Sequence, residues 1–163
     1  AGVRQGDIVL AIDQKPIKRL ADYQAAMRGT QKGQTLTVSL LHDGREKQIQ
    51  VKAGLFPPEM APKLVQRLFG IQVVDISEKG RFDRQIAADS GVIITDVDAN
   101  SVLGHIGARA GDVIRKIDEI RVADLETFYK AVIKYRWKTS VVLLLQRGSQ
   151  GYYITVNLFD RSS

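Results

Sequence analysis

The side chains that most often carry out chemistry in proteins are scarce in this sequence, and they are not spaced for catalysis. Cysteine is absent, which excludes disulfides, thiolate metal sites and a cysteine nucleophile. The two histidines, His42 and His105, have no second histidine or cysteine at metal-ligand spacing. Ser90 and Ser149 lie outside any Gly-Xaa-Ser-Xaa-Gly motif. We therefore expect no catalytic residue, no metal, no cofactor and no enzymatic activity in this chain alone.

The composition is typical of a globular protein with a basic surface. Of 163 residues, 44% are hydrophobic, which is enough for a packed core. The 24 Lys and Arg against 18 Asp and Glu give a net charge of +6, which favours anionic partners such as nucleic acid, acidic lipid or a peptide carboxylate. Nucleic-acid binding rests on this charge alone, since no run of five like charges forms a basic arm, and we expect none.

No segment resembles a membrane span or a leader. The apolar runs reach about five residues, as at 141–145, against the roughly 20 that cross a bilayer. The sequence opens on AGVRQGDIVL, which reads as the interior of a folded unit, and we expect the chain to be a fragment.

An internal repeat organises the chain. Adding 105 to a residue number in the first third reaches a like residue without a gap, so that GVRQGDIVLAID at 2–13 aligns with GARAGDVIRKID at 107–118. The same register matches the alternating apolar residues of 36–40 with those of 141–145. We predict an incomplete first domain at 1–53, a linker at 54–63 and a complete second domain at 64–163.

The elements of this unit can be read from local patterns. A Gly-Asp turn precedes an apolar strand at 111–117, and Thr127 is a candidate N-cap for a helix that ends near Trp137. In the first copy, Asp22 is the candidate cap of the same helix. Alternating residues at 141–145 and 152–158 flank a turn and predict a hairpin. Strands at 69–74 and 91–97 and a short helix at 101–106 complete an α+β fold, a partly open β-barrel of five or six short strands capped by two helices.

Three segments of this unit resemble PDZ domains: GVIITDV at 91–97, Asn100-Ser101, and GARAGDVIRKID at 107–118. The permuted bacterial kind is the most similar, and two units in tandem resemble the C-terminal regulatory part of HtrA/Deg-type serine proteases. The segment at 100–107 departs from the small-residue pattern of the family. Residues 77–89 resemble the variable loop after the peptide-pairing strand, a candidate contact with ligand or partner domains.

The resemblance implies a peptide-binding site. PDZ domains add a peptide C-terminus as a strand at a sheet edge beside a helix, and N–H groups of a glycine loop hold its carboxylate. RLFGI at 67–71 matches the loop, and the strand after it would pair with the peptide. On the helix, Phe128 and Val132 face either the groove or the core, and Arg67 is otherwise an ordinary surface residue. The predicted peptide-binding residues are Arg67, Leu68, Phe69, Gly70, Ile71, Gln72, Val73, Phe128 and Val132.

The same resemblance implies the cellular role. We expect a substrate-recognition module for peptide C-termini and unfolded proteins, working with a trypsin-like serine protease domain of the same parent chain in the bacterial periplasm or cell envelope. A homo-oligomer is among the expected assemblies. The alternative is a PDZ scaffold or secretion component unconnected to a protease.

Two glycines of the second copy, Gly70 and Gly111, are expected to behave differently when they are substituted. In the loop, Gly70 is predicted to matter for binding and not for folding, because its N–H would face the carboxylate. In the turn before a core strand, Gly111 is predicted to matter mainly for stability.

Overall fold

The computed structural model describes residues 2–76 and 86–158, which form two compact units, Ala1–Leu55 and Phe56–Ser163. This division lies near the predicted domain borders. The predicted linker at 54–63 is not a plain linker, however, because its second half contains a short 3-10 helix, η1 (Pro58–Met60), and the start of a helix, α2 (Ala61–Phe69).

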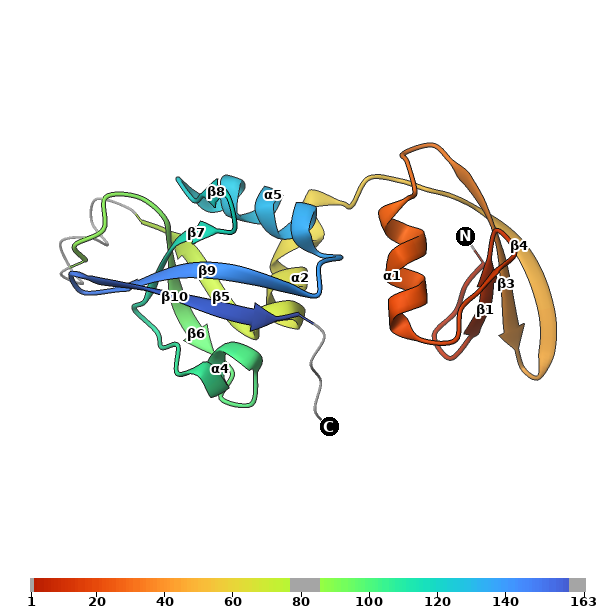
Figure 1. Ribbon diagram of the computed structural model, residues 1–163, viewed down its shortest axis with the longest axis horizontal. Helices are drawn as coiled ribbons and strands as arrows, with labels where there is room; N and C mark the ends of the chain where they lie inside the picture. Colours follow the sequence, from red (N-terminus) through yellow and green to blue (C-terminus); the bar gives the residue numbers. More distant parts are fainter. Residues whose placement is uncertain (1, 77–85, 159–163) are drawn as a thin grey trace. The chain divides into compact units, whose positions relative to one another are not determined.

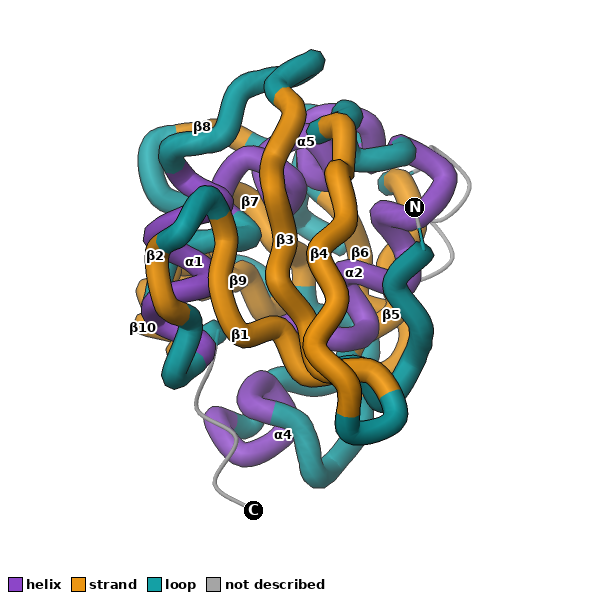
Figure 2. The backbone as a smooth tube through the Cα atoms, turned by 90° about the vertical axis from the view of Figure 1, so that its right-hand side faces the viewer, coloured by secondary structure: helices purple, strands orange, loops and turns teal. Residues whose placement is uncertain are grey.

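The first unit is a four-stranded antiparallel sheet with one helix. The sheet has the order β2-β1-β3-β4, built from β1 (Ile8–Ile12), β2 (Lys15–Pro16), β3 (Thr35–His42) and β4 (Arg45–Lys52). Strands β3 and β4 run side by side as a long hairpin (Figure 2). Helix α1 (Leu20–Arg28) packs Tyr23, Ala26 and Met27 against a core that includes the fully buried Leu40.

The second unit contains the longer sheet, with the order β10-β9-β7-β6-β5 and β8 paired to β7. Its strands are β5 (Ile71–Asp75), β6 (Val92–Val97), β7 (Val113–Ile117), β8 (Ile120–Arg121), β9 (Ser140–Arg147) and β10 (Gln150–Asn157). Figure 1 shows α5 (Leu125–Tyr135) above the strands of this unit and α4 (Val102–Ile106) below them. The α+β PDZ-like fold is confirmed, but the described sheet is open, with β5 and β10 at its edges.

The repeat is confirmed at the level of single residues. Adding 105 to the bounds of β1, β2, β3 and β4 gives the bounds of β7, β8, β9 and β10. Both copies have a register shift at the same place, between Val9 and Ala11 and between Ile114 and Lys116. The described residues of the first unit contain no counterpart of β5 or β6.

Helix α2 is the element that the sequence reading missed. Ala61, Leu64, Val65 and Leu68 are all buried and recur at helical spacing, which gives α2 one apolar face. Pro62 stands in the first turn, where its missing N–H costs nothing, and Gly70 ends the helix at φ 68°. The prediction of a loop at 67–71 and of a strand beginning at Phe69 is therefore wrong: the helix continues to Phe69 and the strand begins at Ile71.

The helix caps also differ from the prediction. Asp124, not Thr127, is the N-cap of α5, and its carboxylate accepts the Thr127 N–H at 2.7 Å. In α1 the N-cap is Arg19, and Asp22 lies three residues further on, accepting the N–H groups of Lys18 and Arg19. Asp124 satisfies an N–H group of the first turn of α5, whereas Asp22 binds the N–H groups of the two residues that precede α1.

Candidate functional site

One surface hollow beside a sheet edge lies along β5. It is a groove of about 340 Å³ between α2, β5 and α5. Its lining residues are Pro62, Lys63, Val65 and Gln66 from α2, Ile71, Gln72 and Val73 from β5, and Tyr129 from α5.

Strand β5 offers this groove a free backbone edge. It pairs with β6 along one side and with no other described strand. Ile71 and Val73 point into the core, whereas Gln72 and Val74 are exposed on the opposite face. A strand in this position presents N–H and C=O groups that another extended chain can pair with.

The predicted glycine loop is the C-terminal turn of α2. Leu68 and Phe69 are buried in the main core, and Arg67 is exposed in the last helical turn. Gly70 donates its N–H to the carbonyl oxygen of Gln66 at 2.9 Å, and its own carbonyl accepts the Asp98 N–H at 2.8 Å. Of residues 67–71, Ile71 alone lines the groove, and the backbone groups of Gly70 are bonded inside the unit.

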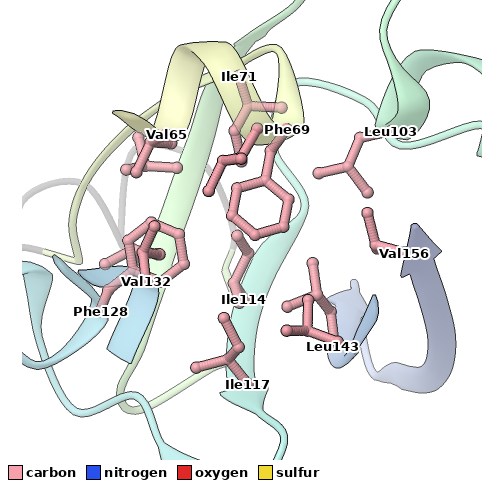
Figure 3. Packing of buried hydrophobic residues seen from close by; sticks show 14 of the residues in the cluster. Val65, Phe69, Ile71, Leu103, Ile114, Ile117, Phe128, Val132, Leu143 and Val156 are labelled. Atoms are coloured by element: carbon pink, nitrogen blue, oxygen red, sulfur yellow. The ribbon is translucent and has the colours of Figure 1, made fainter. Parts of the chain in front are cut away.

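The helix α5 contributes a different residue from those predicted. Phe128 is 0% exposed and Val132 is 1% exposed, and both belong to the main core. Figure 3 shows Val65 of α2 above these two side chains, and Phe69 above Ile114. Tyr129, which the sequence reading missed, is the α5 residue that lines the groove. Tyr129 was difficult to identify from the sequence, because it is adjacent to Phe128 and only the packing of α2 decides which of the two side chains faces outward.

Asp75 fixes the far end of the groove. Its carboxylate accepts the N–H of Leu125, the first residue of α5, so the end of β5 is joined to the start of that helix. Burial, and then the negative charge of Asp75, raise the pKa of Tyr129 above its ordinary value. Tyr129 therefore keeps its hydroxyl proton at neutral pH and presents an uncharged ring and a hydrogen-bond donor to the groove.

Gly70 is packed against the start of α4. A Cβ at this position would lie 2.0 Å from the Cβ of Ser101 and 2.5 Å from its hydroxyl oxygen. Ser101 is itself held in place as the N-cap of α4, where it accepts the Gly104 N–H at 3.1 Å. The expectation that Gly70 matters little for folding is wrong, because the close contact with Ser101 leaves no room for a side chain.

A buried carboxylate anchors the Gly-Asp turn that precedes β7. Asp112 is 1% exposed and accepts hydrogen bonds from the Arg147 guanidinium at 2.7 Å, the Arg109 N–H at 2.9 Å and the Tyr152 hydroxyl at 3.3 Å. Burial acts to raise the pKa of Asp112, but these bonds and the Arg147 charge outweigh it, so the pKa is lowered. In the first unit the same positions are Asp7 and His42, which lie 2.6 Å apart.

The variable segment predicted at 77–89 lies mostly outside the described residues. Its last part, 86–89, packs on the sheet, where Ala88 is buried with Ile93 and Val113. Asp89 forms an ion pair with Arg115 at 2.6 Å. This part is held by the sheet itself and is not among the residues that line the groove.

The described residues hold neither a metal cluster nor a spanning helix. Over 2–76 and 86–158, no group of three or more His, Asp or Glu side chains could hold a metal ion. Each helix in the same ranges is too short or too polar to cross a bilayer.

Comparison with known proteins decides the family. The PDZ domain family matches residues 1–53 and 68–158, which together are most of the chain. This chain belongs to the PDZ domain family. The two matched ranges correspond to the two copies of the repeat, so the PDZ units are arranged in tandem.

The relatives are serine proteases of the HtrA/Deg type. The periplasmic serine endoprotease DegP of Escherichia coli strain K12 is 30% identical over 156 residues, which is 94% of this chain and 30% of DegP. A probable DegP-like periplasmic serine endoprotease of Ectopseudomonas mendocina is 24% identical over 98% of this PDZ chain and 35% of its own length. The chain therefore spans about a third of the relatives that it matches. Among solved structures, the HtrA-type protease AlgW with a decapeptide has a TM-score of 0.50 at 15% identity, covering 75% of this chain and 48% of AlgW.

Proposed function

We propose that the second PDZ unit binds extended peptides by adding them as a strand to the free edge of β5. The observation that carries this proposal is the groove itself: a sheet edge lies open beside Tyr129 and the apolar side chains of α2 and β5. In strand addition, main-chain hydrogen bonds supply affinity and the pockets between strand and helix select alternate side chains. The decapeptide in the AlgW structure supports a peptide as the ligand class.

The other edge of the sheet is a poorer candidate. In β10, Val156 is the one buried residue of the strand, and the other side chains are exposed or half-buried. Tyr153 stands out from this strand with 67% of its surface exposed. A peptide at β10 would gain backbone bonds but little apolar burial, which supplies most of the free energy of association.

Replacing Tyr129 with alanine tests the location of the site. We expect Tyr129→Ala to weaken peptide binding by about tenfold or more, since a buried aromatic at the centre of an interface commonly contributes at least that much. Titration of the protein with a fluorescent decapeptide of alternating valine and threonine measures the effect.

Tyr153→Ala is the matched control, because it removes the same side chain from the edge strand β10. Its affinity should equal that of the unchanged protein, and unfolding curves should show that both variants are folded. Equal loss of affinity in the two variants would place the peptide elsewhere.

We further propose that the parent protein is an HtrA/Deg-like serine endopeptidase of the bacterial periplasm or cell envelope, in which this region recognises unfolded substrates. The similarity to DegP over nearly the whole chain supports this role. Hydrolysis of unfolded casein by the full-length gene product, and its loss with a serine-protease inhibitor, tests the proposal. A full-length product that binds casein without cleaving it would favour the alternative, a PDZ scaffold or secretion component.

A further inference from the structure

One wall of the groove is formed by the chain's own helix α2. Val65 of α2 is 1% exposed and shares the main core with Ile71, Phe128 and Val132 (Figure 3). These three residues come from the strand and the helix between which a bound peptide would insert its side chains. The buried side chain of Val65 therefore fills the space beside Ile71, the first residue of β5.

Three backbone N–H groups at this end of β5, those of Leu68, Phe69 and Gly70, are used inside the molecule. Because residues 61–69 are α-helical, the N–H groups of Leu68 and Phe69 point back to carbonyls one turn earlier. The Gly70 N–H donates to the Gln66 carbonyl at 2.9 Å. A concave set of N–H groups, the usual device for holding an anion with backbone, is thus not formed by Leu68, Phe69 and Gly70.

The local electrostatics also oppose a carboxylate at this place. The C-terminus of α2 directs its carbonyl groups, and the partial negative charge of the helix dipole, toward Gly70. Asp98 adds a formal negative charge nearby, since its Cβ is 3.5 Å from where a Gly70 Cβ would be. Arg67 in the last turn and Lys63 one turn earlier offset part of this charge, but both side chains are exposed and therefore strongly screened.

We infer that the groove takes an extended segment from within a polypeptide chain and does not recognise a free C-terminal carboxylate. This inference rests on the proposed function of the same groove and names its substrate class. The ligand pairs with β5 opposite Tyr129 and leaves the groove past Lys63 and Gln66, whose side chains are solvent-exposed. Internal segments with alternating apolar side chains are abundant in unfolded proteins, whereas each chain has one C-terminus.

Three matched peptides test the inference on the whole chain, residues 1–163. One fluorescent decapeptide of alternating valine and threonine is prepared with a free terminal carboxylate, with a terminal amide, and embedded between Gly-Ser flanks of about six residues. We expect the three dissociation constants to agree within about threefold. Titration by fluorescence anisotropy, repeated with Tyr129→Ala, measures them.

The outcomes separate the two proposals. A free acid that binds at least tenfold more tightly than the amide and the embedded form would overturn the inference while leaving strand addition at β5 intact, because charge-assisted bonds to the carboxylate would then dominate. Binding of all three peptides that Tyr129→Ala leaves unchanged, or no binding at all, would instead contradict the proposed function.

Discussion

Gly70→Ala should lower the free energy of unfolding of the second unit by about 3 kcal/mol or more, the sum expected from an overpacked contact and a left-handed backbone. The added methyl would lie 2.0 Å from the Cβ of Ser101, and the backbone has a φ of 68°. Ser101 cannot move away easily, because it caps α4 and its hydroxyl donates to the Asp98 carbonyl at 2.6 Å. Chemical denaturation followed by tryptophan fluorescence and circular dichroism measures the change.

Gly111→Ala is the control for the backbone contribution. Gly111 has a φ of 96°, but a Cβ there would meet no atom within 4 Å. Its cost should be the conformational part alone, about 1–2 kcal/mol.

A double-mutant cycle with Ser101→Gly isolates the contact. Replacing the Ser101 cap by glycine costs only about a few tenths of a kcal/mol, and it removes the atoms that clash with the new methyl. Gly70→Ala should therefore be much less harmful in the Ser101→Gly background than alone. Equal costs of Gly70→Ala in both backgrounds would show that the contact with Ser101 is not the cause.

Arg147→Ala should destabilise the second unit by about 3 kcal/mol, the lower end of the range for breaking a buried ion pair. The substitution leaves the carboxylate of Asp112, whose side chain is 2% exposed, without its two guanidinium bonds. The value falls at the lower end because Arg147 is itself half-exposed, so water can enter the space that it leaves. Lys130→Ala is the control: its pair with Glu126 is exposed on both sides, so its loss should change the stability little.

The pH dependence of this difference follows from the direction of the Asp112 pKa. In the unchanged protein that pKa is lowered from 3.8, so its stabilising effect is present above about pH 4 and is lost as the pH falls through the lowered pKa. Without Arg147, its hydrogen bonds and its charge no longer lower the pKa of Asp112, so the ionised carboxylate stabilises the variant less than the unchanged protein. The stability gap between the two proteins should be widest near pH 7 and shrink below pH 4. A gap that stays constant between pH 7 and pH 3 would show that the lost stability is not electrostatic.

The local signals of the sequence were enough for most of the fold. The 105-residue repeat predicted which strands correspond, and the structure places β1–β4 and β7–β10 at those offsets. Turn residues and alternating apolar positions specify these hairpins within short stretches, so little depends on distant parts of the chain.

The groove was harder to predict because its walls depend on tertiary packing. The apolar positions of α2 and the cap at Gly70 were visible in the sequence, but the family resemblance assigned part of the same residues to a loop. Whether Phe128 or Tyr129 faces outward depends on α2 packing against α5, which no local pattern encodes. The Asp112–Arg147 pair also joins residues far apart in sequence, which the pairing of β7 with β9 brings together.

The most direct test of strand addition at β5 is to locate a bound peptide relative to the two edges of the sheet. Isotope-filtered nuclear Overhauser measurements on the labelled protein, with the unlabelled valine-threonine decapeptide, detect protons closer than about 5 Å, the reach of neighbouring strands. We expect contacts from the peptide backbone to residues 71–75 of β5 and from its side chains to the ring of Tyr129. Contacts to residues 150–157 of β10, with none to β5, would contradict the account.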